Sequence, residues 1–406
     1  MDTSAFDQIE KRIGALEQKV NTHAAVQSLA QVSRIYPKTN SVIFVGLSYF
    51  GDNIKYAYLA FQKVAREKNV TCAFLTEDAS QQTLLEMAGL PYLSSKHPDY
   101  LPLMLSAKVV VLHDVFYPIQ SGIVPHALLQ GAKFIQLWHG IPLKEIGLKS
   151  QAHFEIMAAC GPFEALVATN ASSKAVWAQR FLFRDFAPIG YPRDDVLFRE
   201  PTTSDMINVD KETLSRMEQA RREGKTTILY APTFRDAGNM SWFDKARIHQ
   251  FAGHCRSKGY LLCINLHPGE QVATESLRMR YPELQFVAPK TDVYPLIKET
   301  DILVTDYSSL AFDFLLLDRP LVFYRPDHDD YIAKSRPMIP GRDHYTVGPM
   351  TKAVEDLVAA TDAAADRSLP DAYADKRVAL RKELYDRRDG KAGDRFCKLV
   401  MKYLNE

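Results

Sequence analysis

A histidine between a tryptophan and a glycine, at the end of a short apolar run, is the residue that points most directly to chemistry. The run Lys133–Leu137 is typical of a buried parallel strand, and Gly140 and Pro142 interrupt the pattern after it. A histidine at the carboxyl end of such a strand faces the crevice where open α/β sheets bind ligands. Imidazole suits proton transfer near neutral pH, so His139 is a candidate general base, although a histidine buried in a core fits the same pattern.

Three later segments have the same form, an apolar run that ends abruptly in polar residues. They are Thr227–Asp236, Leu261–Pro268 and Asp301–Ser309. In the last of them, Ser308 or Ser309 can cap a helix, with Asp313 in or near the first turn. A helix N-terminus offers free N–H groups and the positive end of its dipole, which together with two hydroxyls predicts a phosphate site. A plain helix cap is the alternative interpretation.

Seven segments, in order along the chain, resemble the motifs of the CDP-glycerol glycerophosphotransferase family, which includes teichoic-acid primases and polymerases. They are Asp52–Tyr56, Trp138–Lys144, Gly190–Asp195, Tyr230–Asp236, Leu266–Pro268, Thr305–Asp313, and Asp389–Ala392 with Arg395. Three positions depart from the family's motifs: Ile141 replaces threonine, Phe234 replaces tryptophan, and Asp194 replaces asparagine. The departures spare both histidines and the serine pair, but they leave the alditol and the acceptor open.

The resemblance implies a reaction in which an acceptor hydroxyl attacks the β-phosphorus of a CDP-alditol, forms a phosphodiester and releases CMP. It assigns His139 as the base, and His267 as a hydrogen-bond partner of the pyrophosphate or an acid for the leaving phosphate. A structural cap before Pro268 is the alternative for His267. Phosphoryl transfer depends mainly on positioning and electrostatics, so the remaining site residues are expected to bind substrate. They are Gly140, Lys144, Arg193, Thr233, Arg235, Asp306, Ser308, Ser309 and Asp313.

Side-chain chemistry suggests individual roles for these residues. Arg235 can bind a phosphate through two hydrogen bonds, and Lys144 either adds positive charge or is an ordinary surface lysine. Asp306 can orient a histidine or a ligand hydroxyl, and Asp313 can bind a ribose hydroxyl or favour the helix start. Arg193, in the segment between the expected domains, can instead be structural.

An acidic cluster at Asp327–Asp330 raises the question of a metal, because oxygen-rich sites suit magnesium. The cluster follows a strand and a proline, so a solvated loop is the favoured interpretation. A helix dipole and an arginine can replace a metal, and we expect no cofactor and no essential divalent ion. The five cysteines are scattered without CxxC spacing, which argues against a disulfide framework or structural zinc and for a reducing cytosol.

Composition restricts the partners and the location. The 406 residues carry a formal net charge of +1, so no global electrostatic feature indicates a nucleic-acid partner. No run of about 18 apolar residues predicts a membrane span, and the N-terminus lacks the features of a signal peptide. We therefore expect a cytoplasmic protein, with any membrane contact peripheral and on the inner face. The expected partners are a CDP-alditol donor and a glycan or lipid-linked acceptor.

Strands alternate with helices along both halves, which predicts doubly wound parallel sheets. The expected strands are Ser41–Val45, Thr71–Leu75, Lys108–Leu112, Phe134–Leu137, Ala165–Ala168, Thr227–Tyr230, Leu261–Leu266, Leu284–Val287, Ile302–Thr305 and Pro320–Tyr324. The expected domains are a helical extension (1–36), a Rossmann-like acceptor domain (37–187), a Rossmann-like nucleotide-donor domain (188–375) and a C-terminal helix that packs back on the first domain (376–406). Two such domains facing a cleft form the GT-B architecture, which the resemblance also implies.

Residues 5–33 have a helical pattern with an apolar seam. The seam residues are Phe6, Ile9, Ile13, Leu16 and Val20. This seam can dimerise the chain, lie on an anionic membrane, or dock on its own domain, and it is too short to decide between these outcomes.

Two other functions remain open. One is a GT-B glycosyltransferase that moves a sugar from a nucleotide sugar, which the identity of the released nucleotide would distinguish. The other is an inactive binding or assembly protein that uses the N-terminal helix as a partner surface, which the intact His139, His267 and serine pair disfavour. Single addition and polymerisation also remain open.

Overall fold

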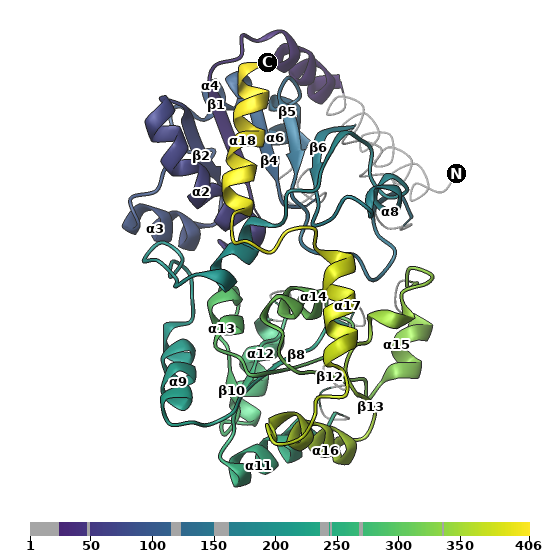
Figure 1. Ribbon diagram of the computed structural model, residues 1–406. Coiled ribbons are helices and arrows are strands. Elements are labelled where there is room, and N and C mark those ends of the chain that lie inside the picture. The colour runs from purple at the N-terminus through teal and green to yellow at the C-terminus, as the bar shows by residue number, and fades with distance from the viewer. Residues whose placement is uncertain are drawn as a thin grey trace, which may run out of the picture.

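The structure, a computed structural model, describes residues 24–46, 49–114, 123–149, 162–235, 243, 246–267, 271–334 and 337–406. Two parallel sheets flanked by helices form two domains, the first above the second in Figure 1. Residues 24–35 are helical, whereas the apolar seam predicted for residues 6–20 lies outside the described residues. The two sheets confirm the predicted α/β fold class.

The first sheet has seven parallel strands in the order β3-β2-β1-β4-β5-β6-β7. The strands are β1 Ser41–Val45, β2 Thr71–Leu75, β3 Tyr92–Leu93, β4 Val109–Leu112, β5 Lys133–Gln136, β6 Phe163–Val167 and β7 Phe183–Ala187. The strand order reverses direction between β1 and β4, where ligand crevices form at the carboxyl ends of such sheets. His113 follows β4 and His139 follows β5, its neighbour, so both histidines lie at this end.

The second sheet has six parallel strands in the order β10-β9-β8-β11-β12-β13. The strands are β8 Thr227–Ala231, β9 Leu261–Ile264, β10 Gln285–Phe286, β11 Ile302–Thr305, β12 Leu321–Tyr324 and β13 Met350–Thr351. The order reverses between β8 and β11, and the Thr233 loop and the serine pair follow these two strands. All ten predicted strands are present, with bounds within two residues.

Helices cover both sheets and connect their strands (Figure 1). They are α2 Asp52–Lys68, α3 Ala79–Met87, α4 Tyr100–Ser106, α6 Ile123–Leu128, α8 Lys174–Ala178, α9 Lys211–Arg222, α11 Ile248–Lys258, α12 Gln271–Arg280, α13 Tyr294–Lys298, α14 Leu310–Phe314, α15 His328–Lys334, α16 Val354–Ala365, α17 Ala374–Leu384 and α18 Ala392–Asn405. Short 3-10 helices occur at Gly147–Lys149, Pro192–Phe198, Leu315–Leu317 and Asp343–Tyr345. No helix in the described ranges is long and apolar enough to cross a bilayer.

The chain ends in two helices rather than in the single helical run predicted from residue 376 onward. The run breaks between α17 and α18, where Gly390 has a φ of +63°. The Asp195 carboxylate accepts hydrogen bonds from the N–H groups of Ala392 and Gly393, at 2.9 and 2.8 Å, and so starts α18 from a distant part of the chain. In Figure 1, α18 lies on the first domain while α17 lies on the second.

A buried ion pair joins α2 of the first domain to the second domain. Lys55 Nζ lies 2.6 Å from the Asp292 carboxylate, and both side chains are almost inaccessible to water. Lys55 also donates to the carbonyls of Asp205 and Ile207, and the Tyr56 hydroxyl donates to Asp292. Lys55 and Tyr56 therefore hold the two domains together, because the buried ammonium group finds its ion-pair partner and both carbonyl acceptors in the second domain.

Candidate active site between the two sheets

His139 lies at the carboxyl end of β5, half-buried and stacked on its neighbour. The imidazole ring and the Trp138 ring are 4.1 Å apart between centroids, at an angle of 29°. Trp138 has a φ of +56°, a left-handed conformation that is unusual for a residue with a bulky side chain. The Arg193 guanidinium donates to the His139 carbonyl at 3.0 Å. The stack on Trp138 therefore restrains the His139 ring, and the hydrogen bond from Arg193 restrains its backbone. The left-handed conformation of Trp138 costs conformational energy.

Gly140 brings the His139 loop into contact with the predicted phosphate site. A Cβ built on Gly140 would lie 2.6 Å from Ser309 Oγ, and the glycine φ of +149° is itself unfavourable for other residues. Ser308 Oγ accepts the Leu310 N–H at 3.3 Å, and both serines are partly exposed. The helix α14 that follows them has only five residues, so the helix dipole predicted to attract a phosphate is that of a short helix.

Arg193 is a structural hub, as the sequence allowed. Its buried guanidinium pairs with Asp52 of the first domain and, at 2.8 Å, with Asp313 of the second. Asp313 also accepts from the hydroxyls of Tyr294 and Tyr385, so the structure engages it with protein groups rather than leaving it for a ribose. Burial alone would lower the pKa of Arg193, but the negative charges of Asp313 and Asp52 outweigh it, so the pKa is raised.

His113 is a residue that sequence reasoning missed. It is fully buried, its Nε2 lies 3.6 Å from the Asp52 carboxylate, and its ring centroid lies 5.8 Å from that of His139. Burial lowers the pKa of His113, against the opposing effect of Asp52, so the imidazole is neutral at physiological pH. The pattern that identified His139, a buried strand followed by histidine, also occurs at Val109–His113 and provided the missing signal.

The second domain contributes a separate group centred on Asp306. This buried carboxylate accepts the Thr233 N–H at 2.8 Å and lies 2.8 Å from Arg235. Arg235 also donates two hydrogen bonds to Asp327, at 2.8 and 3.0 Å. Two carboxylates therefore already neutralise Arg235, the residue predicted to bind phosphate. Asp306 was predicted to orient a histidine or a ligand hydroxyl, and here it orients the Thr233 loop.

The interpretation of Asp327–Asp330 as a solvated loop is wrong in part, because residues 328–330 are helical and the Asp327 side chain is buried, whereas Asp329 and Asp330 are exposed. Asp327 is a buried partner of Arg235, and His328 begins α15. Aspartates in the first turn of a helix are stabilised by its dipole, which explains the acidic run. The described residues contain no group of three or more potential metal-ligating side chains.

Lys144 lies near enough to His267 for its charge to act on the imidazole. Lys144 donates to the Tyr331 hydroxyl of α15 at 2.7 Å and forms an antiparallel bridge with Met338, so it fastens the two domains together. His267 follows β9, is exposed, and lies 5.4 Å from the Phe234 ring between centroids. Desolvation of the ring by neighbouring protein atoms, and secondly the positive charge of Lys144, lower the pKa of His267.

A comparison of the sequence with protein families identifies the family of this chain. Residues 28–402 match the family model described as CDP-Glycerol:Poly(glycerophosphate) glycerophosphotransferase. The chain belongs to this family. As a glycerophosphotransferase family member it is a transferase, and the resemblance inferred from the seven motifs is confirmed.

Relatives of this family member act in teichoic-acid synthesis. The teichoic acid ribitol-phosphate primase of Bacillus spizizenii is 26% identical over 74% of this chain and 76% of the primase. The teichoic acid poly(glycerol phosphate) polymerase of the same organism is 28% identical over 56% of this chain and 60% of the polymerase. The chain thus spans about three fifths of that polymerase.

Solved structures confirm the fold of this family member. The wall teichoic acid polymerase TagF superposes with a TM-score of 0.72 at 20% identity, covering 98% of each chain. TagF has also been solved after soaking with CDPG. The match confirms the predicted two-domain, GT-B-like architecture.

Proposed function

We propose that this enzyme transfers glycerol phosphate or ribitol phosphate from a CDP-activated donor to a hydroxyl of a glycan or lipid-linked acceptor, and releases CMP. The observation that carries the proposal is the contact between Gly140 and Ser309. It sets the loop of the candidate base against the candidate phosphate-binding serines, which come from the other domain. Membership in the family supplies the class of donor.

The reaction needs a base and an in-line leaving group. In the proposed step, His139 takes the proton of the acceptor hydroxyl while its oxygen bonds to the β-phosphorus of the donor. The bond between that phosphorus and the bridging oxygen breaks, and CMP leaves with this oxygen. The Trp138 stack and the Arg193 hydrogen bond support the proposal, because a base must be held rigidly.

The donor phosphates have hydroxyl partners on the second domain. Thr233 Oγ1 is buried and has no hydrogen-bond partner within the described ranges, so it can donate to a phosphate. Ser308 and Ser309 add two hydroxyls after β11. His267, with its lowered pKa, is neutral near pH 7 and is proposed to donate a ring N–H to the pyrophosphate.

The proposed setting is the cytoplasmic face of the cell membrane, where an activated cytidine donor can meet a lipid-linked acceptor. Peripheral membrane contact and self-association through the N-terminal helix are parts of this proposal that need their own measurement. Sedimentation of the chain with anionic and neutral vesicles tests the first, and light scattering of the chain alone tests the second.

Product identification tests the reaction. The chain is incubated with CDP-glycerol, CDP-ribitol or UDP-sugars and an acceptor, and nucleotides and products are separated by chromatography with mass detection. CMP released together with a phosphodiester supports the proposal, whereas UDP released with a glycoside supports the glycosyltransferase alternative. Activity is expected to persist in chelator, and a complete loss restored by magnesium would overturn the expectation of metal-free chemistry.

A further inference from the structure

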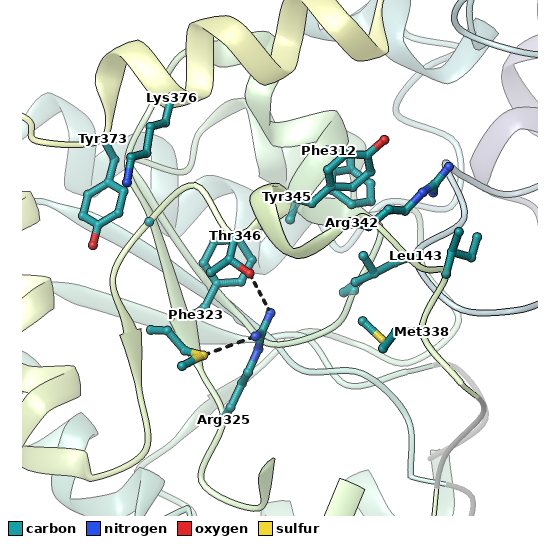
Figure 2. Close-up of a pocket in the computed structure, with 15 residues that line it drawn as sticks. Leu143, Phe312, Phe323, Arg325, Met338, Arg342, Tyr345, Thr346, Tyr373 and Lys376 are labelled. Carbon is teal, nitrogen blue, oxygen red and sulfur yellow. Dashed lines mark hydrogen bonds between the residues drawn. The ribbon is translucent and has the colours of Figure 1, made fainter. Parts of the chain in front are cut away.

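A cavity of about 570 Å³ opens beside Ser308 and lies outside both side-chain groups described above. Figure 2 shows its aromatic walls and three cationic side chains that come from different elements. Arg325 follows β12, Arg342 precedes the 3-10 helix at Asp343–Tyr345, and Lys376 lies on α17. Leu143 from the His139 loop also lines the cavity, so both domains contribute to it.

Arg325 is a buried cation whose hydrogen-bond partners are all neutral. Only 8% of the residue is exposed, and it donates to the Asp306 carbonyl, to Thr346 Oγ1 and to Met350 Sδ. Its guanidinium also lies 4.5 Å from the Tyr307 ring centroid. No carboxylate pairs with it in the part of the chain that the structure describes. Such a charge is costly to bury, so an anion that enters the cavity relieves an existing penalty.

Each of the two other cations lies near an aromatic ring and forms no ion pair within the described residues. Arg342 lies 5.0 Å from the Tyr345 ring centroid, and Lys376 lies 5.2 Å from the Tyr373 ring centroid. None of the described lining residues is an aspartate or a glutamate. The cavity therefore combines three positive charges with apolar walls and carries no negative charge of its own.

The other arginines near the serine pair are already neutralised. Asp306 and Asp327 pair with Arg235, and Asp52 and Asp313 pair with Arg193. Phosphate binding next to Ser308 needs positive charge that is not already matched by a carboxylate. The cavity cations meet that requirement.

We propose that this cavity is a phosphate-binding subsite in which Arg325 holds a substrate phosphate group beside Ser308, while Arg342 and Lys376, on other sides of the cavity, add positive charge. The source of the phosphate rests on the proposed function: it is the diphosphate of the donor, or a phosphodiester already present in the acceptor. The aromatic side chains that line the cavity contact the non-phosphate part of the donor or of the acceptor. Arg235, in contrast, positions the Thr233 loop.

The test uses Arg342→Gln and Lys376→Gln in the full chain, because Arg342 is partly exposed and Lys376 is exposed, and their loss leaves the buried Arg325 in place. Lys382→Gln, an exposed lysine of the same helix α17, is the matched control. Calorimetry measures the affinity for inorganic pyrophosphate and for CDP-glycerol. Steady-state kinetics measures the KM for acceptors with no phosphodiester and with one or more glycerol phosphate units.

Each variant is expected to weaken phosphate binding a few-fold, the usual effect of removing one partly exposed positive charge near an anion, while the control changes nothing. Weaker pyrophosphate and CDP-glycerol binding identifies the donor as the source. A raised KM confined to phosphodiester-bearing acceptors identifies the acceptor. Unchanged donor affinity and unchanged KM in both variants overturn the subsite while leaving the proposed function intact. Pyrophosphate binding that depends on these cations, without turnover of any CDP-alditol, supports the subsite and refutes the proposed function.

Discussion

Gly140 and Ser309 meet across the boundary between the two domains, so closely that a side chain on the glycine does not fit. A Cβ on residue 140 would lie 2.6 Å from Ser309 Oγ and 3.0 Å from Ser309 Cβ. The loop of the candidate base and the candidate phosphate loop therefore fix each other's position.

Replacing Gly140 with alanine should reduce both stability and transferase activity, the activity by about tenfold or more, because misplacement by an ångström is costly in catalysis. Gly89→Ala is the control, since Gly89 has a φ of +63° but open space around it, and the conformational cost alone is about 1 kcal/mol. The double variant Gly140→Ala/Ser309→Gly should recover part of the melting temperature. Equal losses in Gly140→Ala and Gly89→Ala would show that the contact with Ser309 does not matter.

Removing the charge of Arg193 should destabilise the chain by about 3–5 kcal/mol, because the buried Asp313 and the partly buried Asp52 would lose their cationic partner. Arg193→Met keeps most of the volume, and chemical denaturation followed by fluorescence measures the effect. Arg184→Met removes an exposed arginine that lies 3.6 Å from Glu164, and should change stability by less than about 1 kcal/mol. A similar small change for Arg193→Met would contradict the role of this residue as a hub.

Asp194 should make the folded chain less stable as the pH rises. Burial, and secondly the nearby Asp313, raise the pKa of Asp194 well above its ordinary value of 3.8. The folded chain then holds a proton that the unfolded chain releases. This contribution to stability is complete below the ordinary pKa and is lost as the pH rises towards the raised one.

Asp194→Asn should therefore be more stable than the natural chain at neutral pH, and its stability should vary less with pH. Melting temperatures between about pH 5 and pH 8 measure both effects, with Asp99→Asn, an exposed aspartate, as the control. Asparagine also restores the residue that the family motif usually has. A lower melting temperature for Asp194→Asn at every pH would refute the proposed protonation.

His139→Ala should lower kcat by about 10²–10⁴-fold, the usual contribution of a general base, and should leave nucleotide affinity nearly unchanged. His97→Ala, at a partly exposed position of the same domain, is the control. Stopped assays of CMP release measure kcat, and calorimetry with CMP measures affinity. A loss of CMP binding that equals the loss of rate would assign His139 to donor binding instead.

The sequence predicted most of the strands because they have a local signal. Apolar runs of four to six residues predicted ten strands, including the two-residue β10, while β3 and β13, also with two residues each, gave no such signal. The strand β7 was missed because Arg184 and Asp185 interrupt its apolar pattern. Local composition therefore misses some of the edge strands, namely those that are very short or that charged residues interrupt.

Charge pairing across the fold could not be predicted in the same way. Arg235 was expected to bind phosphate, and its partner Asp327 lies 92 residues further along the chain. Only the folded arrangement shows that this charge is matched while that of Arg325 has neutral partners. A single sequence shows which side chains can bind an anion, but their counter-ions are a property of the tertiary structure.

The return of α18 to the first domain has a consequence for synthesis of the chain. Phe396 packs against Phe44 of β1, with ring centroids 6.1 Å apart, and Tyr403 is buried on the same domain. The core of the first domain therefore includes residues that the ribosome adds after the whole second domain. The second domain can complete its sheet during translation, whereas the first must wait, with part of its apolar surface open, until the last helix emerges.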